Sequence, residues 1–410
     1  MFTRAFDIVL FGATSFVGQI TAHHMSDRFG KNSQVNWAIA GRDLKKLGKL
    51  RRQLGGSAEN IPIILADSAD EQSIKNLCQQ TRVVATTVGP FDLYGELLVK
   101  ACAETGTDYC DLTGEVQFIK RMIDSYGEQA KASGARIVHC CGFDSIPSDL
   151  GVFFLQDQAL QRWSEPCSHI DMRVTKMKGM LSGGTIASMI NVAKVLKQQP
   201  DLRKPFKNPY LLVDELKRPK ERQKDLRSVE FDSQADAWSA PFIMAGINTR
   251  VVFRTNSLLN DAYGQPFYYN EAIVTGKGKK GRRRAKMMVL GLAGLWLGIL
   301  LAPSRWLLQK FVLPKPGQGP SAQEQLDGSY QLQFFGRTDS GRQLTVEITG
   351  DRDPGYGSTS KILTQAAECL AFDLEKEQYP GGFWTPASLM GKKLIKRLTS
   401  HAGLTFKVLD

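Results

Sequence analysis

The sequence predicts an α/β protein: a Rossmann-type doubly wound parallel sheet followed by a second, mixed α+β domain. Three observations lead to this fold class. Short apolar runs alternate with amphipathic segments in the first third of the chain, which is typical of a parallel sheet covered on both faces. A glycine turn follows the first apolar run. Further on, a basic run at 277–286 precedes the most apolar stretch of the chain, and we expect that segment to associate with a membrane.

Composition and charge narrow the class of protein. A chain of 410 residues with 42% hydrophobic and 23% charged residues is globular and long enough for two cores of ordinary size. Its 7 cysteines lack a paired CxxC framework, which predicts a reducing, cytosol-facing compartment and no metal site. The first strand begins almost at Met1 and leaves no room for a signal peptide, so we expect no export. The net charge is +12, but no zinc finger, RNA-binding aromatic signature or basic helix with interleaved aromatic residues points to nucleic acid.

The first part of the chain alternates between strand and helix. Strands are expected at 7–11, 36–40, 61–66, 83–88, 108–112 and 136–140. Helices are expected to begin near Phe16, Leu44, Asp70, Tyr94 and Val116. We therefore expect a first domain at 1–150. A mixed domain at 151–358 includes the basic run 277–286 and the apolar segment 287–313, and a C-terminal helix and tail at 359–410 pack back on the core.

Beyond Pro147 the alternation fades and period-2 patterns dominate. These patterns predict strands at 170–174 and 248–254, and a hairpin of 330–336 and 343–350. The charged segment 198–233 predicts a solvent-facing helix with loops. A turn-rich linker is expected at 315–320, and a helix at 358–372 closes the core.

The turn after the first strand has the features that a bound diphosphate requires. Gly12 permits a tight turn, Gly18 lets the next helix lie close to the strand, and main-chain N–H groups at the helix start point at the phosphates. Ser15 replaces the usual middle glycine, so its side chain must either turn aside or donate a hydrogen bond to phosphate. The alternative is a purely structural turn. The cofactor-binding residues expected here are Gly12, Ala13, Thr14, Ser15, Phe16, Val17 and Gly18.

Later strand ends indicate which dinucleotide binds. Enzymes that use NAD commonly carry an acidic residue after the second strand, whereas this chain has Arg42, which can pair with a 2′-phosphate. NADP(H) is therefore expected rather than NAD(H), the alternative being a solvated arginine. Asp67 is placed to accept from the adenine amino group or to cap the next helix. Val88, Gly89 and Pro90 would give a flat backbone edge along the nicotinamide.

Three motifs at strand ends carry a family resemblance. They are Val88-Gly89-Pro90-Phe91 with Tyr94-Gly95, then Asp111-Leu112-Thr113-Gly114-Glu115, then the run from Cys141 to Gly151. Together with 12–18 they resemble the saccharopine dehydrogenase-like oxidoreductases, which include the mycobacterial trans-acting enoyl reductases. The resemblance continues into the linker and 384–388, so it covers nearly the whole chain. Ser15 is the departure from the family pattern.

Reduction by a nicotinamide commonly needs a proton donor near the substrate. The candidates, with Tyr94 and Asp144 marginally first, are Tyr94, Asp144, His139 and Cys141. Asp144 has a structural alternative, because it or Ser145 can cap the helix that starts at Pro147. Asp111 and Glu115 can likewise bind main-chain amides at their own turn.

The apolar stretch 287–302 must be covered, because exposing it would forfeit about 15 kcal/mol of burial free energy. As a helix it would reach about 24 Å, short of the ~30 Å hydrocarbon thickness. The basic run suits anionic headgroups, and Trp296 and Trp306 suit an interface. We expect residues 277–313 to form a peripheral or monotopic hook at the cytoplasmic face of a membrane. A buried core or tunnel helix in a cytoplasmic protein, and a true span, are the alternatives.

These features combine into one expected activity. The resemblance implies an oxidoreductase that reduces a C=C or C=O bond of a lipid- or polyketide-linked acyl substrate. Arg42 adds NADP(H) as the cofactor, and residues 277–313 add the membrane surface as the place of action. One alternative is a saccharopine-type dehydrogenase acting on an amino acid adduct, for which a long apolar segment is a poor match. Another is a non-enzymatic NADP-binding membrane adaptor or sensor. The sequence leaves the oligomeric state open, a homo-oligomer included.

Overall fold

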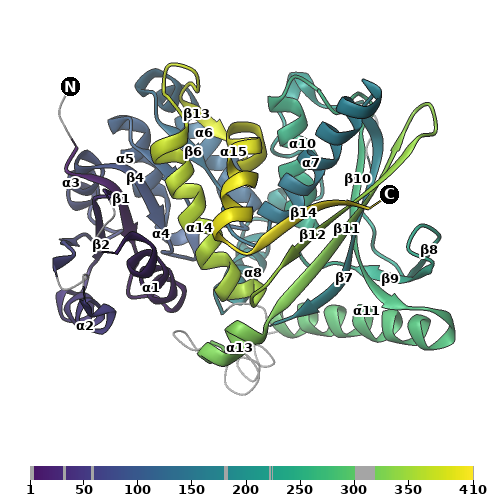
Figure 1. Ribbon diagram of the computed structural model, residues 1–410, viewed down its shortest axis with the longest axis horizontal. Helices are drawn as coiled ribbons and strands as arrows, with labels where there is room; N and C mark the ends of the chain where they lie inside the picture. Colours follow the sequence, from purple (N-terminus) through teal and green to yellow (C-terminus); the bar gives the residue numbers. More distant parts are fainter. Residues whose placement is uncertain are drawn as a thin grey trace. The chain divides into compact units, whose positions relative to one another are not determined.

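The computed structural model describes residues 4–30, 34–56, 60–179, 183–220, 223, 225–300 and 319–409. These residues form two compact units, each with its own sheet (Figure 1). The first unit contains residues 4–143, 319 and 356–402 of the described chain, and the second contains 144–300, 320–355 and 403–409. Both units therefore include residues from the C-terminal part of the chain.

The first unit is a Rossmann-like parallel sheet, as the sequence predicts. Its strand order is β13-β6-β5-β4-β1-β2-β3, and all of its paired strands run parallel. The order reverses between β1 and β4, which is where open α/β sheets bind ligands at the carboxyl ends of the strands. The strands are β1 (Phe6–Phe11), β2 (Trp37–Gly41), β3 (Ile63–Leu65), β4 (Thr81–Thr86), β5 (Asp108–Cys110), β6 (Arg136–Val138) and β13 (Gly382–Trp384).

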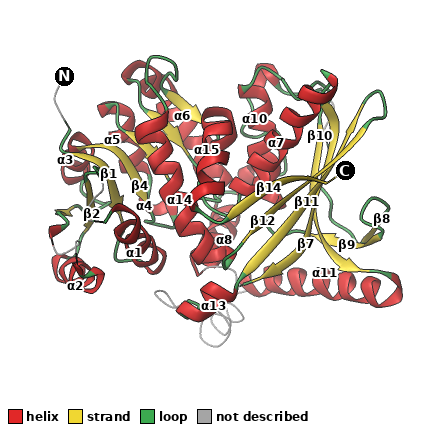
Figure 2. Cartoon of the chain, in the orientation of Figure 1, coloured by secondary structure: helices red, strands yellow, loops and turns green. Residues whose placement is uncertain are grey.

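Helices pack on this sheet in two groups (Figure 2). In one group, α1 (Phe16–Phe29) contacts α2 (Leu44–Leu54) and α14 (Thr359–Glu368), and α14 contacts α15 (Pro386–His401). In the other, α3 (Glu71–Gln80) contacts α5 (Glu96–Thr105), which contacts α6 (Val116–Ser133). The expected helix starts are confirmed, and the short α4 (Phe91–Tyr94) precedes α5.

Local capping explains several of these helix ends. The side chain of Asp43 accepts from the amide of Lys46 at the start of α2, and Asp70 accepts from two amides at the start of α3. Gly106 and Gly134 end α5 and α6 in the left-handed conformation that glycine adopts without steric cost.

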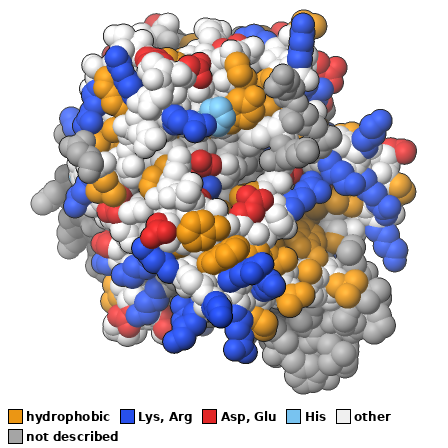
Figure 3. Space-filling model, turned by 90° about the vertical axis from the view of Figure 1, so that its right-hand side faces the viewer, with side chains coloured by type: hydrophobic (Ala, Val, Ile, Leu, Met, Phe, Trp, Pro, Cys, Tyr) orange, Lys and Arg blue, Asp and Glu red, His pale blue; other side chains and the backbone are white. Residues whose placement is uncertain are grey.

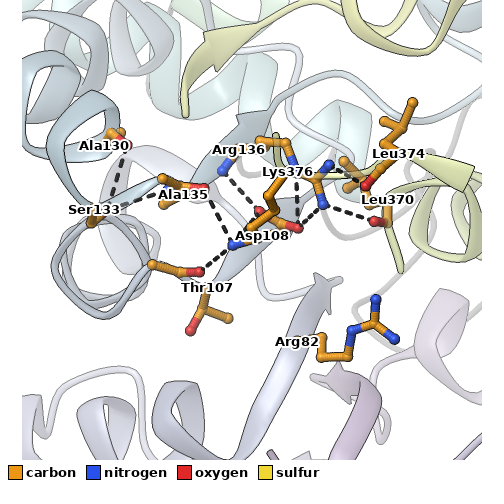
Figure 4. A network of polar contacts seen from close by, with 12 residues as sticks. Arg82, Thr107, Asp108, Ala130, Ser133, Ala135, Arg136, Leu370, Leu374 and Lys376 are labelled. Carbon is orange, nitrogen blue, oxygen red and sulfur yellow. Dashed lines mark hydrogen bonds and ion pairs between the residues drawn. The ribbon is translucent and has the colours of Figure 1, made fainter. Parts of the chain in front are cut away.

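A buried ion pair ties the C-terminal segment to strands β5 and β6 (Figure 4). Arg136 and Asp108 are each 2% exposed at the side chain, and the guanidinium donates to the carboxylate. Arg136 also donates to the carbonyl oxygens of Leu370 at 2.9 Å and Leu374 at 2.7 Å. Because these carbonyls follow α14, the same guanidinium holds the chain segment that leads into β13.

The second unit contains a mixed sheet with strand order β14-β12-β11-β7-β10-β9-β8. Strands β7 and β10 pair in parallel, and the other pairs are antiparallel. The expected hairpin at 330–350 is confirmed as β11 and β12. The strands are β7 (Cys167–Lys178), β8 (Glu230–Asp232), β9 (Ala237–Pro241), β10 (Tyr268–Gly276), β11 (Ser329–Thr338), β12 (Gln343–Gly350) and β14 (Leu404–Leu409).

Two helices of the second unit, α7 (Ile146–Trp163) and α10 (Ala245–Leu258), pack against each other and against this sheet. Gly151 lets α7 approach β11 closely, because a Cβ there would lie 2.2 Å from the ring of Phe334. The prediction of a strand at 248–254 is wrong, since these residues lie inside α10. Its polar residues, such as Asn248, Arg250 and Thr255, are buried and spread around the helix, so they do not form the single polar face that would have revealed a helical period.

The charged segment 198–233 also differs from a single exposed helix with loops. It contains short helical turns at Pro200–Leu202, Arg203–Phe206 (α9) and Glu215–Lys217, and then β8. Four prolines in this segment, Pro200, Pro205, Pro209 and Pro219, interrupt a continuous helix. Most of the expected linker at 315–320 lies outside the described residues.

The basic run and the apolar segment form one helix, α11 (Gly278–Leu300). It contacts β9, β10 and α8 (Gly183–Gln198) within the second unit. The remainder of the expected hook, 301–313, lies outside the described residues. None of the helices described here is long and apolar enough to cross a bilayer.

Candidate functional site

The glycine turn after β1 is constrained by its own packing. Gly12 has φ +85°, and a Cβ there would lie 2.7 Å from Cγ2 of Val88. A Cβ on Gly18 would lie 2.2 Å from the carbonyl oxygen of Gly12. Both positions therefore require glycine for the turn to keep this shape, and the turn lies against the segment after β4.

Ser15 turns its side chain into this loop. Its hydroxyl oxygen accepts from the amide of Gly18 at 3.0 Å and lies 2.9 Å from the hydroxyl oxygen of Thr87. Thr87 donates its single hydroxyl proton to the carbonyl oxygen of Gly12 at 2.9 Å, so Ser15 is the donor to Thr87. The serine thus caps α1, and its proton is used inside the protein.

The main-chain amides at the start of α1 remain available to a ligand. The amides of Gly12 and Ala13 donate to Ala40 and that of Ser15 donates to Gly12. Those of Thr14, Phe16 and Val17 donate to no acceptor in the described part of the chain. The first turn of α1 carries no acidic side chain. These free donors at the positive end of a 14-residue helix fit a diphosphate.

Arg42 and Asp67 follow neighbouring strands at the same edge of the sheet. The amide of Ala66 donates to the carbonyl oxygen of Gly41 at 3.0 Å, which aligns the ends of β2 and β3. Arg42 is exposed and makes no hydrogen bond or ion pair with any described residue, so its guanidinium is available to a phosphate. One carboxylate oxygen of Asp67 accepts from the amide of Ala69 at 3.0 Å, which closes a turn ahead of α3, while the cap of α3 itself is Asp70 rather than Asp67.

The segment after β4 offers an exposed stretch of main chain. Gly89 is exposed, and Val88 and Pro90 are partly exposed. Glu115, fully buried, holds this segment because its carboxylate accepts from the amides of Phe91 at 2.8 Å and Asp92 at 3.3 Å. This arrangement holds the exposed backbone of Val88, Gly89 and Pro90 beside the glycine turn.

The two preferred proton donors lie in different units. Tyr94 ends α4 in the first unit, and its side chain is 46% exposed. Asp144 belongs to the second unit, where burial raises the pKa of its carboxyl to about 6 against a weaker opposing hydrogen bond from Thr185. Its side chain makes no cap on α7, so the structural alternative does not account for it.

The two other donor candidates are enclosed. His139 is 4% exposed, and its Nδ1 lies 2.7 Å from a carboxylate oxygen of Asp111. Its ring packs against Tyr109, Phe118 and Phe383, and its Nε2 is buried with no hydrogen-bond partner in the described chain. The thiol of Cys141 is fully buried, and desolvation raises its pKa well above the ordinary value. Both groups are therefore buried, unlike Tyr94.

One buried polar cluster was not foreseen from the sequence. In the second unit, Asn248 accepts from the hydroxyl of Ser145 at 2.9 Å and donates to Ser148 at 3.1 Å and Glu271 at 3.0 Å. Glu271 also accepts from Tyr269 at 2.7 Å. Burial raises the pKa of Glu271 to about 7. The sequence gives no signal for Asn248, because the pattern around it predicts a strand.

Comparisons with known proteins agree with this geometry. The saccharopine dehydrogenase NADP binding domain matches residues 8–138. A trans-acting enoyl reductase of Mycobacterium bovis is 36% identical over 412 residues, covering 96% of each chain. One of Mycobacterium leprae is 34% identical over 411 residues, covering 97% of this chain and 96% of the relative.

One solved structure supports the fold. The apo saccharopine dehydrogenase (L-Glu forming) of Saccharomyces cerevisiae has a TM-score of 0.53 at 12% identity, covering 99% of this chain and 100% of that one. At that identity the likeness concerns the fold alone. On the full-length relatives and the NADP-binding domain, this chain belongs to the saccharopine dehydrogenase-like oxidoreductase family that includes the trans-acting enoyl reductases, and it is an NADP(H)-dependent oxidoreductase.

Proposed function

We propose that this enzyme uses NADPH to reduce a C=C bond in an acyl chain linked to a polyketide or a lipid, with a C=O bond of such a chain as the alternative target. The observation that carries the proposal is the end-to-end match to relatives named trans-acting enoyl reductase. The free amides at the start of α1 and the exposed guanidinium of Arg42 support the use of a phosphorylated dinucleotide.

The proposal gives each part of the site a role. Residues 12–18 bind the diphosphate, Arg42 binds the 2′-phosphate, Asp67 contacts the adenine, and Val88, Gly89 and Pro90 lie along the nicotinamide. Bound NADPH supplies a hydride to one carbon of the double bond. The other carbon takes a proton, for which Tyr94 and Asp144 remain the candidates. A carboxyl with a pKa of about 6 is partly protonated near neutral pH and can donate.

We also propose that the reaction takes place at the cytoplasmic face of a membrane. Long acyl chains partition into bilayers, and α11 exposes large hydrophobic side chains next to a basic run. The enzyme would then meet its substrate where the substrate concentrates.

The direct test is NADPH oxidation by the purified chain with enoyl and β-ketoacyl thioesters of short and long chain. We expect turnover with an enoyl substrate, at least tenfold faster than with its saturated analogue, and mass spectrometry should find the acyl product heavier by two hydrogens. Lys396→Glu, on an exposed position of α15, is the control for general handling. No NADPH oxidation across the panel contradicts the proposal.

Two arms of the same assay separate the alternatives. Saccharopine with NADP+ tests the saccharopine-type dehydrogenase, and its turnover would replace the acyl substrate. NADPH binding measured by calorimetry, with no turnover of any substrate, would favour the adaptor or sensor instead. The acyl substrate is preferred because exposed apolar side chains such as Met287 and Leu290 suit an acyl chain and not a polycarboxylate.

A further inference from the structure

Helix α11 changes character halfway along its length. From Lys277 to Lys286 the chain has seven Lys or Arg residues and no acidic residue, and from Met287 to Leu300 it has no charged residue. A helix buried in a core would be apolar all round, and an ordinary surface helix would be polar along its whole outer face. The outer face of α11 fits neither description.

One side of α11 is fixed to its own unit. Gly281 and Ala285 are buried, and Thr275 donates to the carbonyl oxygen of Gly281 at 2.9 Å. Further along, Leu295 and Trp296 pack against Ile186, Ile190 and Ala193 of α8. The helix is therefore held in place through one face, and its opposite face is free of the unit.

The free face is apolar in the second half of the helix. Met287 is 61% exposed, Leu290 is 65% exposed and Leu297 is 59% exposed. At about 100° per residue these three positions fall on one side of the helix. Gly291, Ala293 and Gly294 are also exposed, so little polar surface interrupts this stripe. Met288, which is 41% exposed, lies on the other side of the helix.

The free face is basic in the first half. Lys279, Arg283 and Lys286 lie on the same side of the helix as Leu290 by the same helical period. Lys277 pairs with Asp236, and Arg282 stacks over Trp238 at 5.0 Å. The remaining basic side chains of the run are exposed and form no ion pair with described residues: Lys279, Lys280, Arg283, Arg284 and Lys286.

Figure 3 shows this kind of juxtaposition on one face of the molecule, where blue Lys and Arg side chains border an area of orange hydrophobic side chains. An anionic bilayer offers a partner for both kinds of side chain. Negative headgroups attract Lys and Arg at the surface, and the boundary of the acyl chains accepts apolar side chains just below it.

We propose that α11 is a membrane-binding helix specific for anionic bilayers. Its apolar half, through Met287, Leu290 and Leu297, enters the acyl boundary of one leaflet, and its basic half lies on the phosphate headgroups. A second copy of the chain suits this face less well, because a symmetric contact would bring the unpaired cations together. A nucleic acid would leave the apolar half without a partner.

This inference adds the type of membrane to the proposed place of action. It rests on the proposed function only for the biological purpose of membrane binding. The test measures lipid binding and needs no substrate. Failure of membrane binding can therefore be distinguished from failure of the reductase activity. A chain that reduces acyl thioesters in solution but ignores vesicles would refute the inference alone.

The experiment is flotation of the full chain with vesicles of phosphatidylcholine alone and with phosphatidylglycerol added. We expect binding to the anionic vesicles at least tenfold stronger than to the neutral ones, and weakening as salt rises. No binding to anionic vesicles, or equal and salt-independent binding to both, overturns the proposal. Self-association without lipid, seen by sedimentation, together with no flotation, would assign the face to a second copy.

Matched variants test the two halves of the face. Two double variants should each reduce anionic-vesicle binding by about tenfold or more. One is Leu290→Gln with Leu297→Gln, and the other is Arg283→Glu with Lys286→Glu. Leu216→Gln, at a side chain 97% exposed elsewhere in the same unit, controls for loss of an exposed leucine. Lys396→Glu with Lys407→Glu controls for net charge. Equal loss in the control variants would contradict the assignment, and unchanged NADPH binding by calorimetry shows that each variant is folded.

A labelled cysteine reports on insertion directly. All 7 native cysteines are buried, so an added Leu297→Cys can be labelled selectively with an environment-sensitive fluorophore. Anionic vesicles should shift its emission to shorter wavelength, and the same label at Leu216→Cys should not respond. No shift at position 297 in the presence of bound vesicles would exclude insertion of the apolar half.

Discussion

The hydroxyl oxygens of Ser15 and Thr87 lie 2.9 Å apart and join the glycine turn after β1 to the residue that follows β4. Because Thr87 donates to Gly12, the proton of Ser15 is engaged within this link. Ser15, which replaces the usual glycine, therefore makes its hydrogen bonds within the protein. A diphosphate at this turn would be held by main-chain amides rather than by the serine hydroxyl.

Replacing Ser15 by alanine should therefore separate stability from affinity. Ser15→Ala removes the cap of α1, and we expect the free energy of unfolding to fall by about 1 kcal/mol. The dissociation constant of NADPH should change less than about threefold, because no phosphate contact is lost. Urea unfolding and calorimetry check the two parts. A tenfold loss of affinity would mean that the hydroxyl donates to phosphate after all.

Gly18→Ala, unlike Ser15→Ala, should weaken NADPH binding. Its Cβ would lie 2.2 Å from a main-chain oxygen, so the turn must open and displace the amides at the start of α1. We expect NADPH affinity to fall by at least about tenfold, with circular dichroism used to confirm a folded chain. Gly127→Ala is the matched control, since a Cβ there meets nothing within 4 Å. Equal affinity for both variants would remove the turn from the cofactor site.

Arg42→Ala should change cofactor preference. A charge-assisted contact to the 2′-phosphate is worth about 1.5–3 kcal/mol, so NADPH should bind roughly 10- to 100-fold more weakly while NADH, which lacks that phosphate, should bind as before. Arg52→Ala, at another exposed arginine of the same unit, is the control. Parallel weakening of both dinucleotides would assign Arg42 to another role.

Arg136→Met should destabilise the first unit strongly. The substitution leaves Asp108 charged and buried without its guanidinium partner, a situation that costs about 3–5 kcal/mol of unfolding free energy. Hydrogen exchange should also speed up at 370–384, since Arg136 binds the carbonyls of Leu370 and Leu374. Lys131→Met breaks an exposed pair with Glu128 and should cost less than about 1 kcal/mol. A small effect of Arg136→Met would show that the segment is held by other contacts.

Stability should fall between about pH 4.5 and pH 7 through Glu271. Burial raises the pKa of Glu271 from 4.5 to about 7, so the native state keeps its proton in a range where the unfolded state loses it. Stability from this group is full below the unfolded pKa and is lost as pH rises through the folded one, amounting to about 3 kcal/mol. Asp144, with its pKa raised to about 6, acts in the same direction.

Glu271→Gln isolates the contribution of that carboxyl. The amide cannot ionise, so the slope of unfolding free energy against pH should flatten by comparison with the wild type, measured by urea denaturation at several pH values. Glu377→Gln, at an exposed carboxylate, should leave the slope unchanged. An unaltered slope in Glu271→Gln would place the ionisation elsewhere.

Local patterns were sufficient to predict much of the first unit. Strand and helix alternate with clear periods there, and their caps act within one turn, as Asp43 and Asp70 illustrate. The sequence also located the glycine turn and the strand ends that carry Arg42, Asp67 and Gly89, because such turns depend on a few adjacent residues. These determinants are short-range, so they can be seen without the fold.

Tertiary structure decided what long-range packing controls. Asn248 lies in a buried helix rather than the expected strand. The pattern did not reveal this helix, because its polar residues are buried around its whole circumference instead of forming one face. His139 and Cys141 were candidate proton donors in the sequence, but both are buried, and the ring of His139 packs against Phe383, which lies far along the chain. The sequence by itself determined the glycine turn, the basic run and the apolar run, which are contiguous. Only the folded chain decided which side chains were left facing solvent, since exposure depends on neighbours distant in sequence.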